Sequence, residues 1–267
     1  MTENLDTDFA LLDHAMQEAG DIARRYFNGT VKSWEKKPGD PVSEADLALD
    51  AHFRDSLLAA RPDYGWLSEE TADNHARLGK SRVWIIDPID GTRSFIAGKP
   101  EFTIAAALVE DGRPIIGIVY NPVLEEYYEA IKGRGAKLNG RLITCSPKSD
   151  LANTRLIASR NSFDWHGWLD DVKGASFSHV NSIAYRMVKV ASRHADASLS
   201  LTEKSDWDIA AADIILSEAG GITTTTGGDT LIYNRKSIHQ KNVISSGEAL
   251  HPRLMKMLES FGRAKSR

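Results

Sequence analysis

The chain has 267 residues, of which 42% are hydrophobic and 26% are charged. This composition is typical of a folded globular protein and excludes a disordered one, and the length suits one large domain or two closely packed smaller ones. The net charge of −4, without a long block of like charges, predicts neither a direct nucleic-acid partner nor a membrane partner.

The N-terminal segment and the cysteine content predict a cytoplasmic protein. The segment MTENLDTDFALL is acidic and lacks the basic start and apolar core of a signal peptide. No apolar run approaches the length of a membrane-spanning helix. The single cysteine, Cys145, cannot form an intramolecular disulfide, which favours a reducing compartment. We interpret Cys145 as a buried packing residue rather than a nucleophile.

Helical periodicity marks the first part of the chain. Apolar residues recur every three or four positions in residues 9–27, which predicts a helix that ends near Gly29. A polar loop, KKPGDP, follows. Ser43 and Asp46 then have the spacing of a capping box and begin a second predicted helix, which continues to Pro62.

The next part has the pattern of strands separated by tight turns. The Asp111-Gly112 pair is a strong hairpin signal, and Asn139-Gly140 marks another turn. We therefore expect two helices packed against an antiparallel sheet in this half. The predicted strands are 65–68, 83–86, 102–109, 114–120 and 126–131.

The second half alternates between strand and helix patterns, which favours an α/β arrangement. Gly220-Gly221 is expected to stop a long helix. We place a boundary near residue 145, with residues 1–145 forming the first half and residues 146–267 the second. The predicted strands are 154–158, 197–201, 223–226 and 242–245, and the predicted helices are 182–191, 209–219 and a final one from about Pro252.

The segment WIIDPIDGTRSFIAG places two carboxylates close together after an apolar strand. The strand is expected to end at Asp87, and Asp90 follows in a tight turn after Pro88. Hard divalent cations prefer such oxygen ligands. The backbone N–H groups of Gly91 and Thr92 could begin a helix that binds phosphate. Alternatively, this segment is an ordinary Asp-Pro turn that binds neither a cation nor phosphate.

Two further acidic segments lie at the ends of predicted elements. Glu69 and Glu70 directly follow a short apolar strand, where they could contribute to a metal site. Alternatively, they belong to a solvated loop or to the start of a helix. Asp208, in WDIAAADIILSEAGG, lies at a predicted helix start, where its alternative role is that of the N-cap. We interpret Trp207 as a packing residue.

Together, in this order and spacing, the three segments resemble the signatures of the inositol monophosphatase family, and in particular its bacterial SuhB-like and CysQ-like branch. The superfamily also contains 3'(2'),5'-bisphosphate nucleotidases, histidinol-phosphate phosphatases and fructose-1,6-bisphosphatases. The resemblance spans nearly the whole chain. It implies a mixed α and β fold, a layered α/β/α/β/α sandwich with the metals between its two halves. It also implies a homodimer and a small-molecule phosphate ester as substrate.

The resemblance implies a metal site that uses two or three Mg²⁺ ions. Most of the ligands would come from residues 1–145, and the second half would add one carboxylate and the residues that select the substrate. Asp87 would bridge two ions. The implied metal ligands are Glu69, Asp87, the carbonyl of Ile89, Asp90 and Asp208.

Other matching residues would handle water and phosphate. Thr92 would help Glu69 orient the attacking water, and the backbone amides of Gly91 and Thr92 would hold phosphate, beside Asp90 and Asp208. Asp46, in PVSEAD, would support a weaker third metal through water. Glu70 would not bind metal directly.

The implied mechanism needs no covalent nucleophile, because Mg²⁺ neutralises the anionic ester and activates water. The chain contains no GxSxG elbow, phosphatase-type cysteine loop or P-loop. Its eight histidines lack the spacing of a zinc site.

The second half bears on the choice of substrate. Animal inositol enzymes carry a glutamate at the position that Leu201 occupies here, with Glu203 nearby. Arg186, in SIAYR, could bind a second phosphate, or it could be an ordinary surface arginine. The resemblance favours inositol-1-phosphate hydrolysis, with a 3'(2'),5'-bisphosphate nucleotidase as the alternative. A histidinol-phosphate phosphatase and a non-catalytic role with a regulatory protein partner, as for SuhB, are further alternatives.

Overall fold

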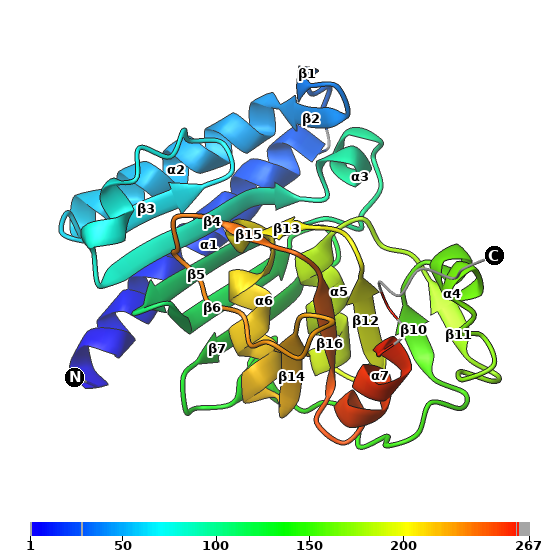
Figure 1. Ribbon diagram of the computed structural model, residues 1–267. Coiled ribbons are helices and arrows are strands. Elements are labelled where there is room, and N and C mark those ends of the chain that lie inside the picture. The colour runs from blue at the N-terminus through cyan, green and yellow to red at the C-terminus, as the bar shows by residue number, and fades with distance from the viewer. Residues whose placement is uncertain (1, 28, 260, 262–267) are drawn as a thin grey trace.

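The computed structural model describes residues 2–27, 29–259 and 261, and it has five alternating layers of helices and sheets (Figure 1). α1 and α2 cover one face of the first sheet, α5 and α6 lie between the two sheets, and α4 and α7 cover the outer face of the second sheet. The expected α/β/α/β/α sandwich is therefore confirmed. The helices are α1 Thr2–Phe27, α2 Glu44–Ala60, the 3₁₀ helix η1 Ala76–Gly79, α3 Thr92–Ile96, α4 Arg160–His166, α5 Ile183–Ala191, α6 Asp206–Glu218 and α7 His251–Leu258.

The first sheet has seven strands, and their spatial order follows their order in the chain. β3 and β4 are parallel, whereas every later pair is antiparallel. Both expected tight turns are present, with positive φ angles at Asp111, Gly112, Asn139 and Gly140. The strands are β3 Gly65–Ser68, β4 Arg82–Asp90, β5 Thr103–Glu110, β6 Arg113–Asn121, β7 Glu126–Ile131, β8 Ala136–Leu138 and β9 Arg141–Ile143.

The second sheet has five strands in the order β11-β10-β12-β16-β14. β10 is parallel to β11 and β12, and β16 is antiparallel to both of its neighbours. Two short ribbons, β1-β2 and β13-β15, lie outside the large sheets. The strands outside the first sheet are β1 Ser33–Lys37, β2 Asp40–Ser43, β10 Arg155–Ile157, β11 Ser176–Ser178, β12 Ala197–Ser200, β13 Lys204–Ser205, β14 Gly221–Thr224, β15 His239–Gln240 and β16 Val243–Gly247.

Alternating side chains of the first sheet fill two different cores. Along β4, Trp84 and Ile86 pack with α1 and α2, whereas Val83 and Ile85 pack into the core that contains α5 and α6. Successive side chains of a strand point to opposite faces, so one apolar run can serve both layers. A third core lies between the second sheet, α4 and α7.

The N-terminal helices follow the expected pattern. On α1, Leu12, Met16, Ala19 and Ala23 are buried, and Phe9 and Phe27 are partly buried against the same core, as periodicity predicts. At the start of α2, the backbone N–H of Ser43 donates to Asp46 Oδ2 over 2.8 Å, which confirms the capping box. Cys145 is buried and free, as expected.

Two expectations for the first half were wrong. The KKPGDP segment is not a plain loop, because it belongs to the β1-β2 hairpin. All residues of β1 are exposed, so the sequence has no alternation of apolar and polar residues that would predict this strand. β4 does not end at Asp87 but continues to Asp90, with a shift of register against β5 between these residues. Such an irregularity bends the strand and re-aims its side chains.

Two expectations for the second half also need correction. Helix α6 begins at Asp206 rather than Ile209, and its N-cap is Ser205, so Asp208 lies inside the first turn. The threonine-rich strand ends at Thr224 rather than Thr226, because Thr226 N instead donates to a side chain, that of Asn242.

The chain passes from the first sheet to the second between β9 and β10, close to the expected boundary at residue 145. The core between the sheets contains residues of both halves, from Leu67 to Val243. The division into two domains stays a prediction. In the part of the chain that the structure describes, no helix has the length and apolarity that crossing a membrane requires.

A glycine on β6 lets α6 approach the first sheet closely. A Cβ at Gly117 would lie 2.5 Å from the carbonyl oxygen of Ala211 and 2.5 Å from Cγ2 of Ile214, both on α6. Gly79, at the end of η1, is a useful contrast because a Cβ there would meet nothing within 4 Å.

We expect Gly117→Ala to destabilise the protein by about 1–3 kcal/mol, because the added methyl group forces α6 away from the sheet. Gly79→Ala should stay within about 0.5 kcal/mol of the parent protein. Urea unfolding of the three proteins measures both changes. Equal free energies of unfolding for the two variants would contradict this description of the interface.

Candidate active site

Four acidic segments meet at one end of the first sheet. β3 and β4 are parallel, so Glu69, directly after β3, lies beside the end of β4, which carries Asp87 and Asp90. The first turn of α2 supplies Asp46, and the first turn of α6, which lies beside β4, supplies Asp208 (Figure 1). The structure therefore brings together acids that lie far apart in the sequence.

Asp87 is at the centre of this acidic group. Its side chain is 1% exposed, and its buried Oδ1 has no hydrogen-bond partner among the residues that the structure describes. Burial is the main reason that the pKa of Asp87 is raised well above its usual value, and the negative charges of Glu69, Asp90, Asp208 and Asp46 raise it further. A buried carboxylate among other carboxylates is costly unless a cation compensates it.

Asp90 is held by the start of α5. Its Oδ2 accepts hydrogen bonds from Ser182 Oγ and from the backbone N–H of Ala184, both over 2.6 Å. Burial raises the pKa of Asp90 to about 6, and the donors on α5 and the charge of Arg186 limit that rise.

Asp208 is held by the start of its own helix. The backbone N–H of Ser205 donates to Asp208 Oδ2 over 2.7 Å. Burial, followed by the negative charge of Asp90, raises the pKa of Asp208 to about 8. The expectation that Asp208 would otherwise be the N-cap was wrong, because Ser205 occupies that position and Asp208 reaches back to it.

Asp46 and Thr92 form a buried pair. Thr92 Oγ1 lies 3.2 Å from Asp46 Oδ1 and 3.0 Å from the carbonyl oxygen of Ile89. A hydroxyl carries one proton, so Thr92 donates to one of these acceptors at a time. Burial raises the pKa of Asp46 to about 6.

Lys36 of the β1-β2 hairpin provides a cation at the edge of the acidic group. Its Nζ lies 2.9 Å from Oε1 of both Glu69 and Glu70. Burial opposes the charge of Lys36, but the two glutamates outweigh this effect and raise its pKa. Burial also raises the pKa of Glu70 to about 7, against the influence of Lys36.

Among residues 2–27, 29–259 and 261, no three His, Cys, Asp or Glu side chains are arranged as a ready metal site. Several carboxylates instead accept hydrogen bonds from the protein. These are Asp46, Glu69, Asp90 and Asp208. The ligand roles of these residues and of Asp87 and Ile89 therefore stay predictions.

Gly91 joins the end of β4 to the short helix α3. It has a φ of 100°, and a Cβ there would lie 3.3 Å from the carbonyl oxygen of Glu101 and 3.3 Å from Cβ of Ser182. Both the left-handed backbone and the close packing favour glycine. The phosphate-binding role of the Gly91 and Thr92 amides stays a prediction.

The residues expected to select the substrate lie in different surroundings. Arg186 is half-buried on α5, its Nε donates to the carbonyl oxygen of Val180, and it acts electrostatically on Asp90, so it is not a free surface arginine. Burial lowers the pKa of Arg186. Leu201 packs against the third core, and Glu203 is exposed.

Asp50 fixes the segment that carries the two glutamates. Its carboxylate accepts from Ser68 Oγ and, over 2.7 Å, from Thr71 Oγ1. These residues lie on either side of Glu69 and Glu70, so one buried side chain of α2 holds both ends of this acidic pair.

We expect Asp50→Ala to lower activity about tenfold at limiting magnesium, because residues that orient metal ligands have effects of this size. The exposed Asp55 of the same helix supplies the matched variant, Asp55→Ala, which should behave as the parent protein. Phosphate release should be measured across a magnesium titration. The same magnesium requirement in all three proteins would argue against a positioning role for Asp50.

Comparisons with known proteins agree with this arrangement. The family model described as the inositol monophosphatase family matches residues 3–262. The chain belongs to this family. It is 30% identical over 257 residues to an inositol-1-monophosphatase of Mesorhizobium japonicum, covering 92% of this chain and 93% of that protein. It is 30% identical over 223 residues to the Nus factor SuhB of Haemophilus influenzae, covering 78% of this chain and 81% of that protein.

A solved structure also matches nearly the whole chain. The extragenic suppressor protein SuhB from Bartonella henselae has a TM-score of 0.82 at 26% sequence identity, covering 94% of this chain and 97% of that one. Family membership identifies this protein as a phosphoric monoester hydrolase of the metal-dependent, inositol-phosphate phosphatase class.

The sequence motifs did not point to several residues that surround the acids. The polar KKPGDP segment gives no sign that Lys36 pairs with the acids, and no motif marks Asp50 or Arg77. Arg77 is 1% exposed, and its Nη1 donates to Asn234 Oδ1 over 2.7 Å. The backbone N–H of Asn234 in turn donates to Asp206, so this link supports the start of α6. Contacts between segments so distant in the chain leave no local sequence signal.

Proposed function

We propose that this enzyme hydrolyses phosphate monoesters with Mg²⁺ and that inositol 1-phosphate is its substrate. The observation that carries the proposal is the unpartnered, buried Oδ1 of Asp87 within a group of acids from four elements. The side chains of this group are carboxylates and offer oxygen atoms, which suit a hard divalent cation. The donor set therefore fits magnesium.

Two or three Mg²⁺ ions would be held by the carboxylates of Glu69, Asp87, Asp90 and Asp208 together with the carbonyl of Ile89. Bound magnesium supplies neutralising charge for the phosphate ester and lowers the pKa of water, so that hydrolysis needs no covalent enzyme intermediate. Asp87, Asp90 and Asp208 have raised pKa values, which is expected of buried acids of a cation site when no cation is considered with them.

The protein side chains would orient water and phosphate. With its proton directed to Asp46 or to the carbonyl of Ile89, Thr92 Oγ1 keeps lone pairs available to accept a hydrogen bond from water. Glu69 would take up a proton from that water. The backbone amides of Gly91 and Thr92 would donate to the phosphate.

Inositol-1-phosphate hydrolysis is supported by the names of the relatives, among them the inositol-1-monophosphatase of Mesorhizobium japonicum. The half-buried Arg186, close enough to affect Asp90, favours a second candidate function. It could accept an additional anionic group, which a 3'(2'),5'-bisphosphate nucleotidase requires.

A phosphate-release panel tests the proposal directly. The purified enzyme should be assayed with inositol 1-phosphate, adenosine 3',5'-bisphosphate, histidinol phosphate and fructose 1,6-bisphosphate, each with magnesium and with chelator. We expect the highest kcat/KM for inositol 1-phosphate and no turnover with chelator. Preference for the adenosine bisphosphate would favour the nucleotidase, and magnesium-independent turnover would overturn the proposal.

We expect Asp208→Asn to lower turnover at least about a hundredfold, on the order of 3 kcal/mol of activation free energy, because a neutral amide binds magnesium poorly. Stability should change by less than about 0.5 kcal/mol or increase, since Asn can still accept from Ser205 while losing a buried charge. Activity and melting temperature should be measured on one preparation. The exposed Asp55 supplies the matched control variant, Asp55→Asn, with unchanged activity. Near-normal activity of Asp208→Asn would remove it from the metal site.

A substitution of Arg186 distinguishes the two candidate substrates. If Arg186 binds a second phosphate, Arg186→Ala should reduce kcat/KM for adenosine 3',5'-bisphosphate about tenfold more than for inositol 1-phosphate. Arg186→Lys, which keeps the charge, should lie between the alanine variant and the parent enzyme. Equal losses on both substrates would exclude this specificity role.

The proposal also covers a protein partner, the cellular compartment and the oligomeric state. The similarity to the Nus factor SuhB of Haemophilus influenzae supports a regulatory protein partner in addition to catalysis. We further propose that the enzyme is cytoplasmic and forms a homodimer, as the family resemblance implies.

A further inference from the structure

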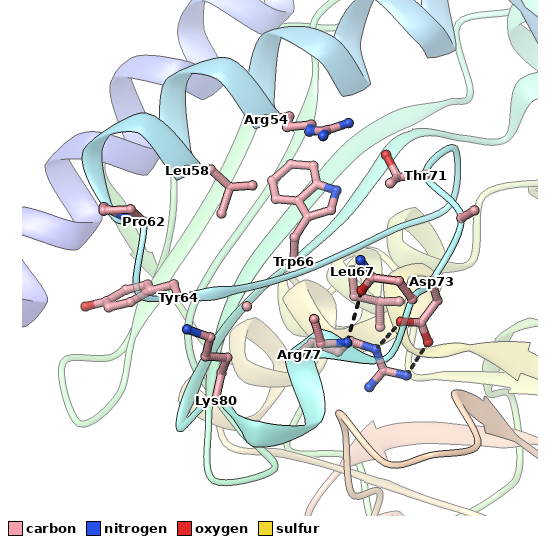
Figure 2. Close-up of a pocket in the computed structure, with 14 residues that line it drawn as sticks. Arg54, Leu58, Pro62, Tyr64, Trp66, Leu67, Thr71, Asp73, Arg77 and Lys80 are labelled. Carbon is pink, nitrogen blue, oxygen red and sulfur yellow. Dashed lines mark hydrogen bonds and ion pairs between the residues drawn. The ribbon is translucent and has the colours of Figure 1, made fainter.

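A cavity lies on the outer side of β3, between α2 and η1 (Figure 2). Its volume is about 370 Å³, which is in the range of small-molecule sites. Trp66 and Tyr64 form its aromatic wall, Leu58 adds an apolar side chain from α2, and Arg54 and Lys80 lie at two of its edges. The cavity is not lined by any of the carboxylates assigned above to the metal site.

The two cations at the rim are available for a ligand. Within the described parts of the chain, the side chains of Arg54 and Lys80 make no hydrogen bond or ion pair, and both residues are exposed. The third cation of the lining, Arg77, is already paired with Asp73 over 2.7 Å. That ion pair also neutralises the one acid of the lining, so the remaining charge of the cavity is positive.

Two uncharged side chains of the lining, Trp66 and Asn74, carry donors that no described residue uses, whereas the hydroxyl proton of Thr71 is already used. The indole N–H of Trp66 is buried and has no acceptor. Figure 2 shows the indole nitrogen on the side of the ring that faces Arg54 and Thr71. Asn74 uses its Oδ1 to accept from the backbone N–H of Ala76, which leaves its NH₂ group as a donor. Thr71 donates to Asp50.

We propose that this cavity binds a small organic anion with a flat ring, an aromatic carboxylate. The ring packs against Trp66 and Leu58, since flat apolar groups stack on aromatic side chains. The carboxylate is bound by Arg54, with Lys80 adding a second positive charge. This binding site is separate from the proposed phosphatase function and does not depend on it.

Naphthoate and its neutral counterpart naphthamide provide a matched pair of probes. Binding is followed by NMR of the tryptophan indole N–H groups of the full chain, in which the Trp66 signal is the one absent from Trp66→Phe. We expect naphthoate to shift the Trp66 signal saturably and to bind about tenfold more tightly than naphthamide. Magnesium and inorganic phosphate, which are expected to bind at the candidate active site, should leave the affinity for naphthoate unchanged.

Substitutions of Arg54 and Lys80 test whether these two residues at the rim recognise the negative charge of naphthoate. Arg54→Gln and Lys80→Gln should each weaken naphthoate binding several-fold, up to about tenfold, and leave naphthamide unaffected. The exposed Lys241, which does not line the cavity, supplies the control Lys241→Gln, with unchanged affinity. The indole spectrum reports folding of each variant. An unshifted Trp66 signal, equal affinity for the two probes, or unchanged naphthoate affinity in both rim variants would overturn the proposal.

Discussion

Repulsion among buried carboxylates is the constraint on which the arrangement of this protein depends. Asp87 has no partner for one buried oxygen, and its charge is opposed by acids from three other segments. Such a group costs folding free energy unless positive charge or protons compensate it. The protein itself supplies some positive charge. Lys36 pairs with Glu69 and Glu70. Arg186 acts electrostatically on Asp90, and Lys204 acts on Asp208. We propose that a bound divalent cation compensates the carboxylates that these side chains leave uncompensated, above all Asp87.

The layered fold holds these acids in place through elements with independent support. Asp90 is bound by the start of α5, Asp208 by the start of α6, and Asp46 by the start of α2. Each helix is packed against the first sheet, and Gly117 lets α6 lie especially close. The acids therefore cannot move apart without disturbing a core, so their repulsion is retained in the folded state.

Much of this structure could be predicted from the sequence. Periodicity located α1 and most strands of the first sheet, and the motif spacing identified the acids that meet at its end. The β1-β2 hairpin could not be predicted in this way, because exposed strands need no apolar alternation. The apolar pattern does not mark the true start of α6, because two acids, Asp206 and Asp208, interrupt the pattern in its first turn. The contacts of Lys36 and Asp50 depend on tertiary packing alone.

The central claim is that the acidic group around Asp87 requires a divalent cation. The most direct measurement is the melting temperature of metal-free protein during a titration with magnesium chloride, compared with sodium chloride at equal ionic strength. A cation that binds the folded state alone stabilises it by mass action. The account predicts that magnesium raises the melting temperature, that sodium does not, and that Asp87→Asn abolishes most of the difference. The same response to both salts in the parent protein would contradict it.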